Sequence, residues 1–163
     1  MTESLEAFHR HIGVYGICIA DGCLLVIRKI KGPYAGKYDL PGGRLEPMET
    51  LEQGLQREIA EETGYRARAC KPVGACDFTV RWTMADRTNE YLHHIAILYA
   101  FEVNRVDTVE AIRMFEEQDS EGALWLPLAD AKSNHCSPLV MQAAEWLRTG
   151  TLPVSAVSVD YRG

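Results

Sequence analysis

GRLEPMETLEQGLQREIAEETGY, residues 43–65, is an acidic stretch with clear signals for both ends of a helix. Thr50 is followed three positions later by Gln53, which is the spacing of a capping box at a helix N-terminus. Gly64 is a natural C-terminal stop, because glycine tolerates the left-handed backbone that ends many helices. The sequence therefore predicts a helix over residues 51–63.

Three glutamates of this helix, Glu58, Glu61 and Glu62, are crowded together. Its apolar stripe consists of Leu51, Leu55 and Ile59. At about 100° per residue, Glu58 and Glu62 each fall about 20° from Leu51, and Glu61 about 80° away. Two carboxylates therefore lie on the core-facing side of the helix. The alternative interpretation, a solvated helix face with salt bridges, does not explain this position. Burying an ionised carboxylate costs on the order of several kcal/mol unless a cation or a hydrogen bond compensates.

Such a cluster predicts a site for a hard divalent cation, Mg²⁺ or Mn²⁺, because these ions prefer oxygen ligands. The Gly42-Gly43 pair allows a backbone path that side chains would block, so a carbonyl there is a further predicted ligand. Arg57 is predicted to pair with Glu49 and to fix the loop against the helix. A bound metal can shield phosphate charge and activate water. The residues alone therefore predict a metal-assisted phosphoanhydride hydrolase.

The spacing from Gly43 through Glu49 and Arg57 to Tyr65 resembles the Nudix box, G-x5-E-x7-R-E-U-x-E-E-x-G-U, where U is a bulky apolar residue. Every fixed position matches, and Tyr65 is the one loose fit. The flanking LPGG, LLVIRK and WLPL segments are also similar to the Nudix family, so the resemblance covers roughly residues 10–149.

The resemblance implies an α+β Nudix fold, with a mixed β-sheet in an α/β/α sandwich. It implies that water attacks a phosphorus of a nucleoside diphosphate linked to a group X. It also implies metal ligation by Glu58, Glu61, Glu62 and the Gly43 carbonyl. Gly42, Glu49 and Gly64 would shape the box, and Arg57 belongs to its catalytic set. The general base is expected to be Glu61 or Glu62, and otherwise Glu121 from the acidic segment 115–122.

Substrate contacts are harder to predict. Arg28, Lys37 and Arg44 are candidate phosphate contacts, with exposed structural cations as the alternative. Phe78, Trp82 and Tyr91 could stack a base, although aromatic residues in strands are more often core. His93 and His94 are neighbours in a strand and point to opposite faces, so at most one of them faces a pocket, and a hydrogen-bonded structural role is expected.

Substrate identity is inferred mostly by elimination. In Nudix subfamilies a proline about 15 residues after the box marks ADP-ribose, and a tyrosine about 16–18 residues after it marks dinucleoside polyphosphates. Positions 80–83 here hold Val, Arg, Trp and Thr. A MutT-like nucleoside triphosphate pyrophosphohydrolase is therefore expected. The alternatives are a nucleotide-sugar or ADP-ribose-type hydrolase and a non-catalytic nucleotide-sensing module.

Composition narrows the cellular setting. The chain has 163 residues, 47% of them hydrophobic and 25% charged, and a net charge of −6, which favours a single soluble domain over residues 1–163 and argues against general nucleic-acid binding. No apolar run is long enough to span a membrane. Five cysteines without CxxC spacing fit a reducing cytoplasm. A homodimer is possible, with the N-terminal segment and the tail 151–163 as contacts.

The remaining elements are read from periodicity and turn signals. Asp21-Gly22 between two apolar runs predicts a hairpin. A short strand is possible near residues 38–40, and the tail is expected to be either an extra strand or a mobile end. The other predicted elements are strands at 12–20, 23–30, 67–82, 90–103 and 122–128, and a helix from 138 to about 149.

Overall fold

The computed structural model describes residues 7–104, 120–152 and 157–163. Its elements in chain order are β1 (Ala7–Ile17), β2 (Ile19–Ala20), β3 (Cys23–Lys29), β4 (Tyr38–Asp39), β5 (Gly42–Gly43), α1 (Leu51–Thr63), β6 (Arg68–Thr83), β7 (Asn89–Glu102), β8 (Ser120–Pro127), the 3₁₀ helix η1 (Leu128–Asp130), α2 (Pro138–Thr149) and β9 (Val157–Tyr161).

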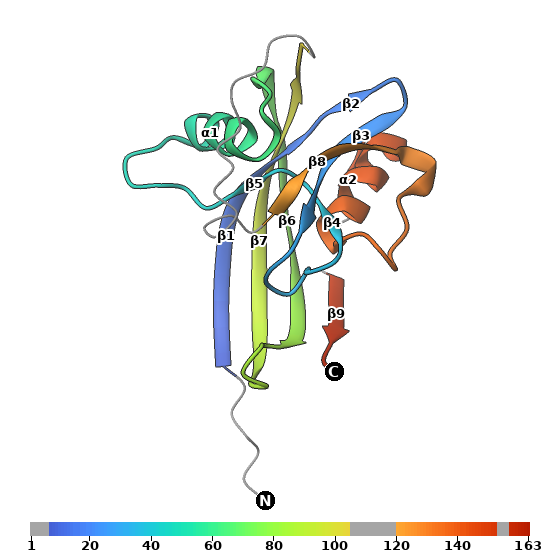
Figure 1. Ribbon diagram of the computed structural model, residues 1–163. Helices are drawn as coiled ribbons and strands as arrows, with labels where there is room; N and C mark the ends of the chain where they lie inside the picture. Colours follow the sequence, from blue (N-terminus) through green and yellow to red (C-terminus); the bar gives the residue numbers. More distant parts are fainter. Residues whose placement is uncertain (1–6, 105–119, 153–156) are drawn as a thin grey trace, which may run out of the picture.

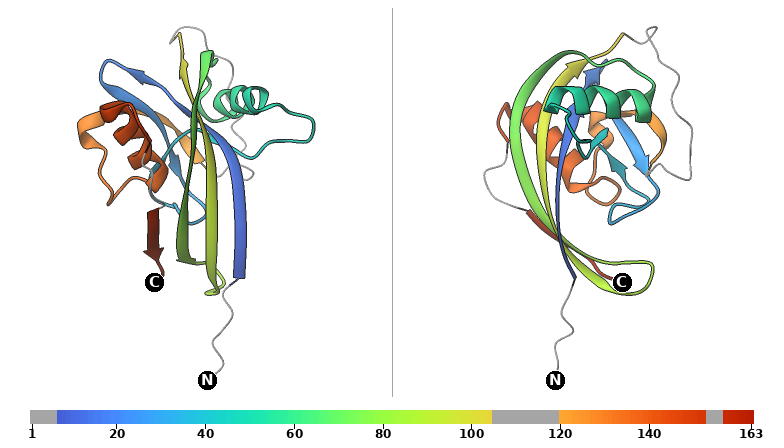
Figure 2. Two further views of the ribbon diagram at one scale, coloured as in Figure 1. Left: turned by 180° about the vertical axis from the view of Figure 1, so that it is seen from behind. Right: turned by 90° about the vertical axis from the view of Figure 1, so that its left-hand side faces the viewer.

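Two sheets lie between the two α-helices (Figure 1). The larger sheet has the strand order β5-β1-β7-β6-β9 and is mixed: β1 runs parallel to β7 and β6 parallel to β9, while the other pairs are antiparallel. In the smaller sheet β3 pairs antiparallel with β2, β4 and β8. The views in Figure 2 show α1 and α2 on different sides of these strands. The predicted α+β class and α/β/α sandwich are confirmed.

Each helix covers its own hydrophobic core. On the α1 side, Leu55 and Ile59 pack with Val14, Leu25 and Phe101. The α2 core contains Leu139, Val140 and Ala143 together with Tyr15, Leu24, Val26 and Phe78. Adjacent residues of β1 and β3 thus enter different cores, because successive side chains of a strand point to opposite faces. This burial on both faces explains the continuous apolar runs of these strands.

The local signals in the sequence are confirmed where turns and caps are concerned. Asp21 and Gly22 have φ values of 51° and 73°, as a two-residue turn between β2 and β3 requires. The Thr50 side chain accepts a hydrogen bond from the Gln53 amide at 3.2 Å, and the Gln53 side chain accepts one from the Thr50 amide at 3.0 Å. Gly64 adopts the left-handed conformation at φ 77° and ends α1.

Two strand predictions need correction or completion. The first strand begins at Ala7 rather than residue 12, and Cys18 interrupts it before β2. The early part was missed because its pattern is inverted: Phe8 and Ile12 are more than half exposed, whereas the side chains of His9 and His11 line a cavity. The tail forms β9, which extends the sheet by pairing parallel with β6. Among the described residues no helix is long and apolar enough to cross a membrane.

Candidate active site

A cavity of about 670 Å³ lies between α1, β5 and the inner face of the mixed sheet. Gly43, which pairs with Val14 of β1, marks one part of it, beside the glutamates of α1. Glu90, which pairs with Ala7, marks the other part, near the β6–β7 hairpin. The cavity therefore follows β1 from the Gly-rich loop towards the strand's first residue.

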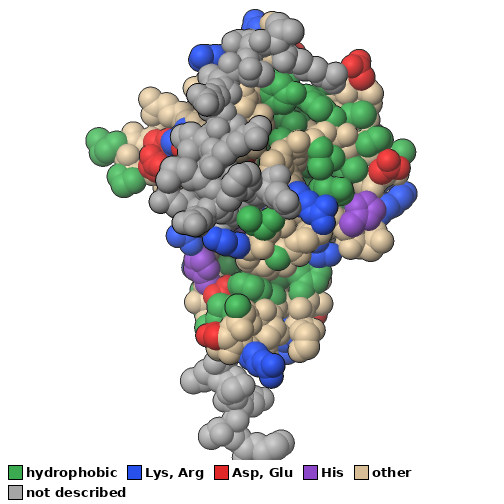
Figure 3. All heavy atoms as spheres, viewed as in Figure 1, with side chains coloured by type: hydrophobic (Ala, Val, Ile, Leu, Met, Phe, Trp, Pro, Cys, Tyr) green, Lys and Arg blue, Asp and Glu red, His purple; other side chains and the backbone are tan. Residues whose placement is uncertain are grey.

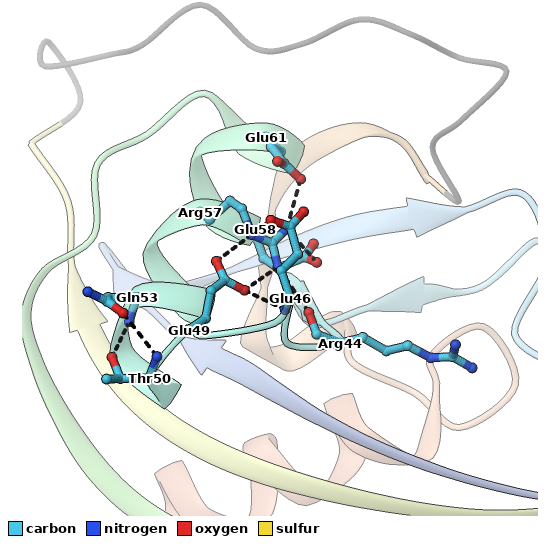
Figure 4. Close-up of polar contacts among 8 residues, drawn as sticks. All are labelled: Arg44, Glu46, Glu49, Thr50, Gln53, Arg57, Glu58 and Glu61. Carbon is cyan, nitrogen blue, oxygen red and sulfur yellow. Dashed lines mark hydrogen bonds and ion pairs between the residues drawn. The ribbon is translucent and has the colours of Figure 1, made fainter.

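Arg57 organises the acidic part of this cavity (Figure 4). Its Nε donates to Glu49 Oε2 at 2.7 Å and its Nη2 to Glu49 Oε1 at 2.9 Å. Its Nη1 donates to Glu58 Oε1 at 3.1 Å and to Glu61 Oε2 at 3.2 Å. These hydrogen bonds lower the pKa of Glu49 and raise that of the guanidinium. The predicted Arg57–Glu49 pair is thus present, and the same guanidinium also orders two carboxylates.

Glu62 contributes a carboxyl group to the cavity from the inner side of α1. Burial raises its pKa well above the ordinary value, and the hydrogen bond and charge of neighbouring Glu58 raise it further. Its Oε2 is buried without a hydrogen-bond partner. The pKa of Glu61 is also raised, first by burial and then by the charge of Glu58. The helical-wheel prediction that Glu58 and Glu62 lie on the inner side of α1 agrees with this placement.

Of the three basic residues considered for phosphate contacts, the structure brings only Arg44 to the cavity. Arg28 is exposed on β3, while the neighbouring Lys29 lines the cavity because adjacent strand residues point to opposite faces. Lys37 lies elsewhere: its Nζ donates to the Asn134 carbonyl and sits 4.9 Å from the Tyr161 ring centroid. Arg28 and Lys37 are therefore not placed for the contacts expected of them.

The inner wall carries a buried chain of polar side chains. The Tyr15 hydroxyl lies 2.9 Å from His94 Nε2, and His94 Nδ1 lies 2.9 Å from the Tyr34 hydroxyl. Burial, with smaller effects of His11, Lys29 and His93, lowers the pKa of His94 to about 3. His94 is therefore neutral, and each of its nitrogens has a partner. The prediction that at most one of the two adjacent histidines faces the pocket is confirmed, since His94 lines it and His93 bonds Asp77 on the opposite face.

The aromatic candidates separate according to their strand faces. Trp82 lines the cavity, and its Nε1 donates to Glu90 Oε1 at 3.1 Å. Phe78 is fully buried in the α2 core. Tyr91 stacks with Phe8 on the other face of the sheet. Among these three candidates for base stacking, only Trp82 is placed in the cavity.

Two residues of the site differ between the sequence prediction and the structure: Asp39 was not predicted, and Glu121 was predicted but its side chain is not described. Asp39 is 3% exposed and was not predicted; its Oδ1 accepts hydrogen bonds from Ser137 Oγ at 2.7 Å and from the Leu40 amide at 2.9 Å, and burial raises its pKa. Its position at the end of a short strand, directly before the LPGG segment, was the available signal. The side chain of Glu121, the second choice for the general base, lies outside the described residues, as does most of segment 115–122.

Comparisons with known proteins agree with this architecture. The family model for the NUDIX domain matches residues 7–149 of the sequence. A MutT-like protein of Streptomyces ambofaciens is 34% identical over 124 residues, which cover 68% of this chain and 79% of that protein. A nucleoside triphosphatase NudI of an Enterobacter species is 39% identical over 71 residues, 42% of this chain and half of that protein.

A solved structure is similar over nearly the whole chain. A NUDIX hydrolase from Nitrosomonas europaea superimposes with a TM-score of 0.64 at 25% identity, covering 90% of this chain and 94% of that one. The family model, the relatives and the geometry of the box helix agree. The chain belongs to the Nudix family and is a hydrolase of phosphoric anhydrides.

Proposed function

We propose that this Nudix hydrolase is a divalent-metal-dependent pyrophosphohydrolase of nucleoside triphosphates. One observation carries the proposal: Glu62 holds a buried carboxylate oxygen without a hydrogen bond beside Glu58 and Glu61. A buried polar atom left unpaired is costly, so a ligand at this point would stabilise the arrangement. Three carboxylates in one cavity supply the hard oxygen donors that Mg²⁺ and Mn²⁺ prefer.

The residues around the cluster fit such an ion. Its ligands would be the Gly43 carbonyl and the carboxylates of Glu58, Glu61 and Glu62. A β-carbon on residue 43 would lie 2.9 Å from Glu58 Oε1, so glycine leaves room for this carboxylate. In the described part of the chain no three acidic, histidine or cysteine side chains already stand in a metal-site arrangement. Binding of the ion would therefore require the three carboxylates to adjust their side-chain positions.

A bound ion would shield the phosphates and lower the pKa of a water molecule. The chain's own groups would do the rest. Arg44 and Lys29 would attract phosphate oxygens, and Trp82 would offer an aromatic face to the base. Glu61 or Glu62 would accept the proton of the attacking water, and burial raises the pKa of both carboxyl groups above the ordinary value.

Several observations support a small nucleotide as the partner. The relatives include a MutT-like protein and a nucleoside triphosphatase. On the face shown in Figure 3, the described acidic and basic side chains form scattered small groups rather than one basic stripe, which does not favour nucleic-acid binding.

All five cysteines are free, in keeping with a reducing cytoplasm.

The test is a substrate panel of dNTPs, NTPs, ADP-ribose, nucleotide sugars and capped RNA, each with and without Mg²⁺. We expect nucleoside monophosphate and pyrophosphate from a nucleoside triphosphate, only in the presence of the metal. Preferred cleavage of ADP-ribose or a nucleotide sugar would reassign the substrate. Tight nucleotide binding without turnover would instead indicate a sensing module, and turnover without any divalent metal would contradict the proposed site.

A further inference from the structure

Two histidines hold the guanidinium of Arg44 over the cavity. Arg44 Nε donates to His11 Nδ1 at 3.2 Å, and Arg44 Nη2 donates to His9 Nε2 at 3.1 Å. The histidines are two residues apart on β1, so both side chains point to the same face of the sheet. All three residues line the cavity. One strand thus supplies two acceptors for a single cation.

The charge of Arg44 is oriented but not neutralised. Four carboxylates lie within ion-pair distance of Arg57, whereas no carboxylate among the described residues lies so close to Arg44. Its side chain extends away from the Arg57 cluster (Figure 4). A guanidinium has five N–H groups, and the two histidines use two of them, so three remain for another acceptor. Phosphate oxygens fit this fork in a bidentate manner.

The contact with Arg44 also determines the tautomer of His11 and therefore how its other nitrogen contacts Tyr15. Because arginine can only donate, His11 must accept at Nδ1, so its proton is on Nε2. His11 Nε2 lies 2.9 Å from the Tyr15 hydroxyl, which can then donate its own proton to His94 Nε2. Tyr15 and His94 are 4% and 2% exposed. His11 is therefore fixed at both nitrogens, by the cavity cation on one side and by the core on the other.

We propose that His9 and His11 are positioning residues that aim Arg44 at the phosphate oxygens of the bound nucleotide, an inference that rests on the proposed function. A pre-oriented side chain loses less freedom when the ligand binds, so its contact contributes more to affinity. An oriented cation that touches phosphate before and during the reaction raises KM when it is lost and changes kcat little.

The test is a set of matched amide substitutions. His11→Asn places an amide oxygen near the position of Nδ1 and keeps an acceptor for Arg44, whereas His11→Gln reaches towards the position of Nε2 and Tyr15. At His9 the preference is reversed, because Arg44 contacts Nε2 there. We expect alanine at either position to raise KM by about tenfold, and His11→Asn and His9→Gln to recover most of that loss. The other amide at each position should not.

A double-mutant cycle with Arg44→Ala separates positioning from general polarity. If the histidines act through Arg44, their alanine substitutions should change KM no further in the Arg44→Ala background. Equal effects in both backgrounds, or equal rescue by the two amides, would overturn the inference. Should the His11 variants unfold, the pair of amide substitutions at His9 gives the same comparison.

The proposed function and this inference fail in different ways. If no nucleotide on the panel is cleaved, the proposed function is wrong. The same cycle can then be read in the dissociation constant of inorganic triphosphate, measured by calorimetry with the wild-type protein and each variant. Coupling between the histidines and Arg44 in that constant would keep the positioning role, and additive effects would reject it.

Discussion

The guanidinium of Arg57 and the carboxylate of Glu49 meet in two parallel hydrogen bonds of 2.7 and 2.9 Å, joining the loop before α1 to the middle of that helix. The same guanidinium donates to the Arg44 carbonyl at 3.0 Å and reaches Glu58 and Glu61. The Arg57 guanidinium thus holds both the backbone beside the cavity and the carboxylates of Glu58 and Glu61 in place.

Arg57→Lys should therefore damage catalysis although it keeps the charge. Lysine has a point-like ammonium and cannot reproduce the bidentate pair with Glu49 together with the contact to the Arg44 carbonyl. We expect kcat to fall by about 10- to 100-fold, since displacement of a catalytic group by about 1 Å has costs of that order. Thermal unfolding should also shift to lower temperature.

The matched control is Arg148→Lys, which alters an exposed arginine paired with Glu145 on α2. It should leave both kcat and the unfolding temperature near the wild-type values, because exposed pairs contribute little. An Arg57→Lys variant with unchanged kcat would show that the planar fork is not needed.

Glu62→Gln should lower kcat by orders of magnitude and yet stabilise the metal-free protein at pH 8. The pKa of Glu62 is raised in the folded state, so between the ordinary carboxyl value and the raised value the folded chain binds more protons than the unfolded chain. Its contribution to stability therefore falls as pH rises through that window. Glutamine does not ionise and avoids this cost, on the order of 1–3 kcal/mol for a buried polar group.

The measurement is thermal unfolding with a chelator at pH 5 and pH 8. The variant should gain on the wild type at pH 8 and lose that advantage at pH 5. Adding Mg²⁺ should stabilise the wild type and not the variant. Glu145→Gln, on the surface of α2, serves as a control without pH-dependent gain. A Glu62→Gln protein that is less stable than the wild type at pH 8 without metal would contradict the burial cost.

The parts of this molecule that were predictable are those coded within a few neighbouring residues. The capping box, the Asp21-Gly22 turn and the inner placement of Glu58 and Glu62 need only local spacing. The polar wall of the cavity was hidden, because the half of β1 that lines it shows histidines where a core strand shows apolar residues. Choosing Lys29 rather than Arg28 as the cavity residue required knowing which face of β3 each side chain occupies. The position of Lys37 depends on its contact with Tyr161, more than 100 positions along the chain.

The two glycines of β5 should respond differently to alanine. A β-carbon at Gly42, where φ is 147°, would lie 2.2 Å from the Val14 carbonyl oxygen, which is backbone and cannot move aside. Gly42→Ala should therefore destabilise the fold by about 2–4 kcal/mol. At Gly43 the obstacle is the end of the Glu58 side chain at 2.9 Å, which can turn away. Gly43→Ala should fold and lose most of its activity.

Urea unfolding and kcat measured on the same samples separate the two effects. Gly22→Ala is the control, since its φ of 73° carries left-handed strain of about 1–2 kcal/mol but a β-carbon there meets open space. It should lose some stability and keep kcat. If Gly43→Ala retained full activity, neither Glu58 nor the backbone at residue 43 would need its present position for catalysis.

His94 should make the protein acid-sensitive. Its pKa is about 3 in the folded state, against about 6.5 for an ordinary histidine, because it is buried among Tyr15, Tyr34 and Phe78. Between these values the unfolded chain binds a proton that the folded chain does not. Stability due to neutral His94 is therefore complete above about pH 6.5 and is lost towards pH 3, by about 1.4 kcal/mol per pH unit.

Glu62 and Asp39, whose pKa values are raised, act in the opposite direction, so the effect of His94 must be isolated as a difference between proteins. His94→Gln keeps an acceptor for Tyr15 and cannot titrate. We expect it to be less stable than the wild type at pH 7.5 and to approach or overtake it by pH 4.5, as measured by urea unfolding. Tyr34→Phe removes one hydrogen bond to His94 but keeps the imidazole, so its difference from the wild type should show no such convergence. A constant gap between His94→Gln and the wild type across this range would mean that the pKa of His94 is the same in the folded and unfolded chains, which would contradict the lowering by burial.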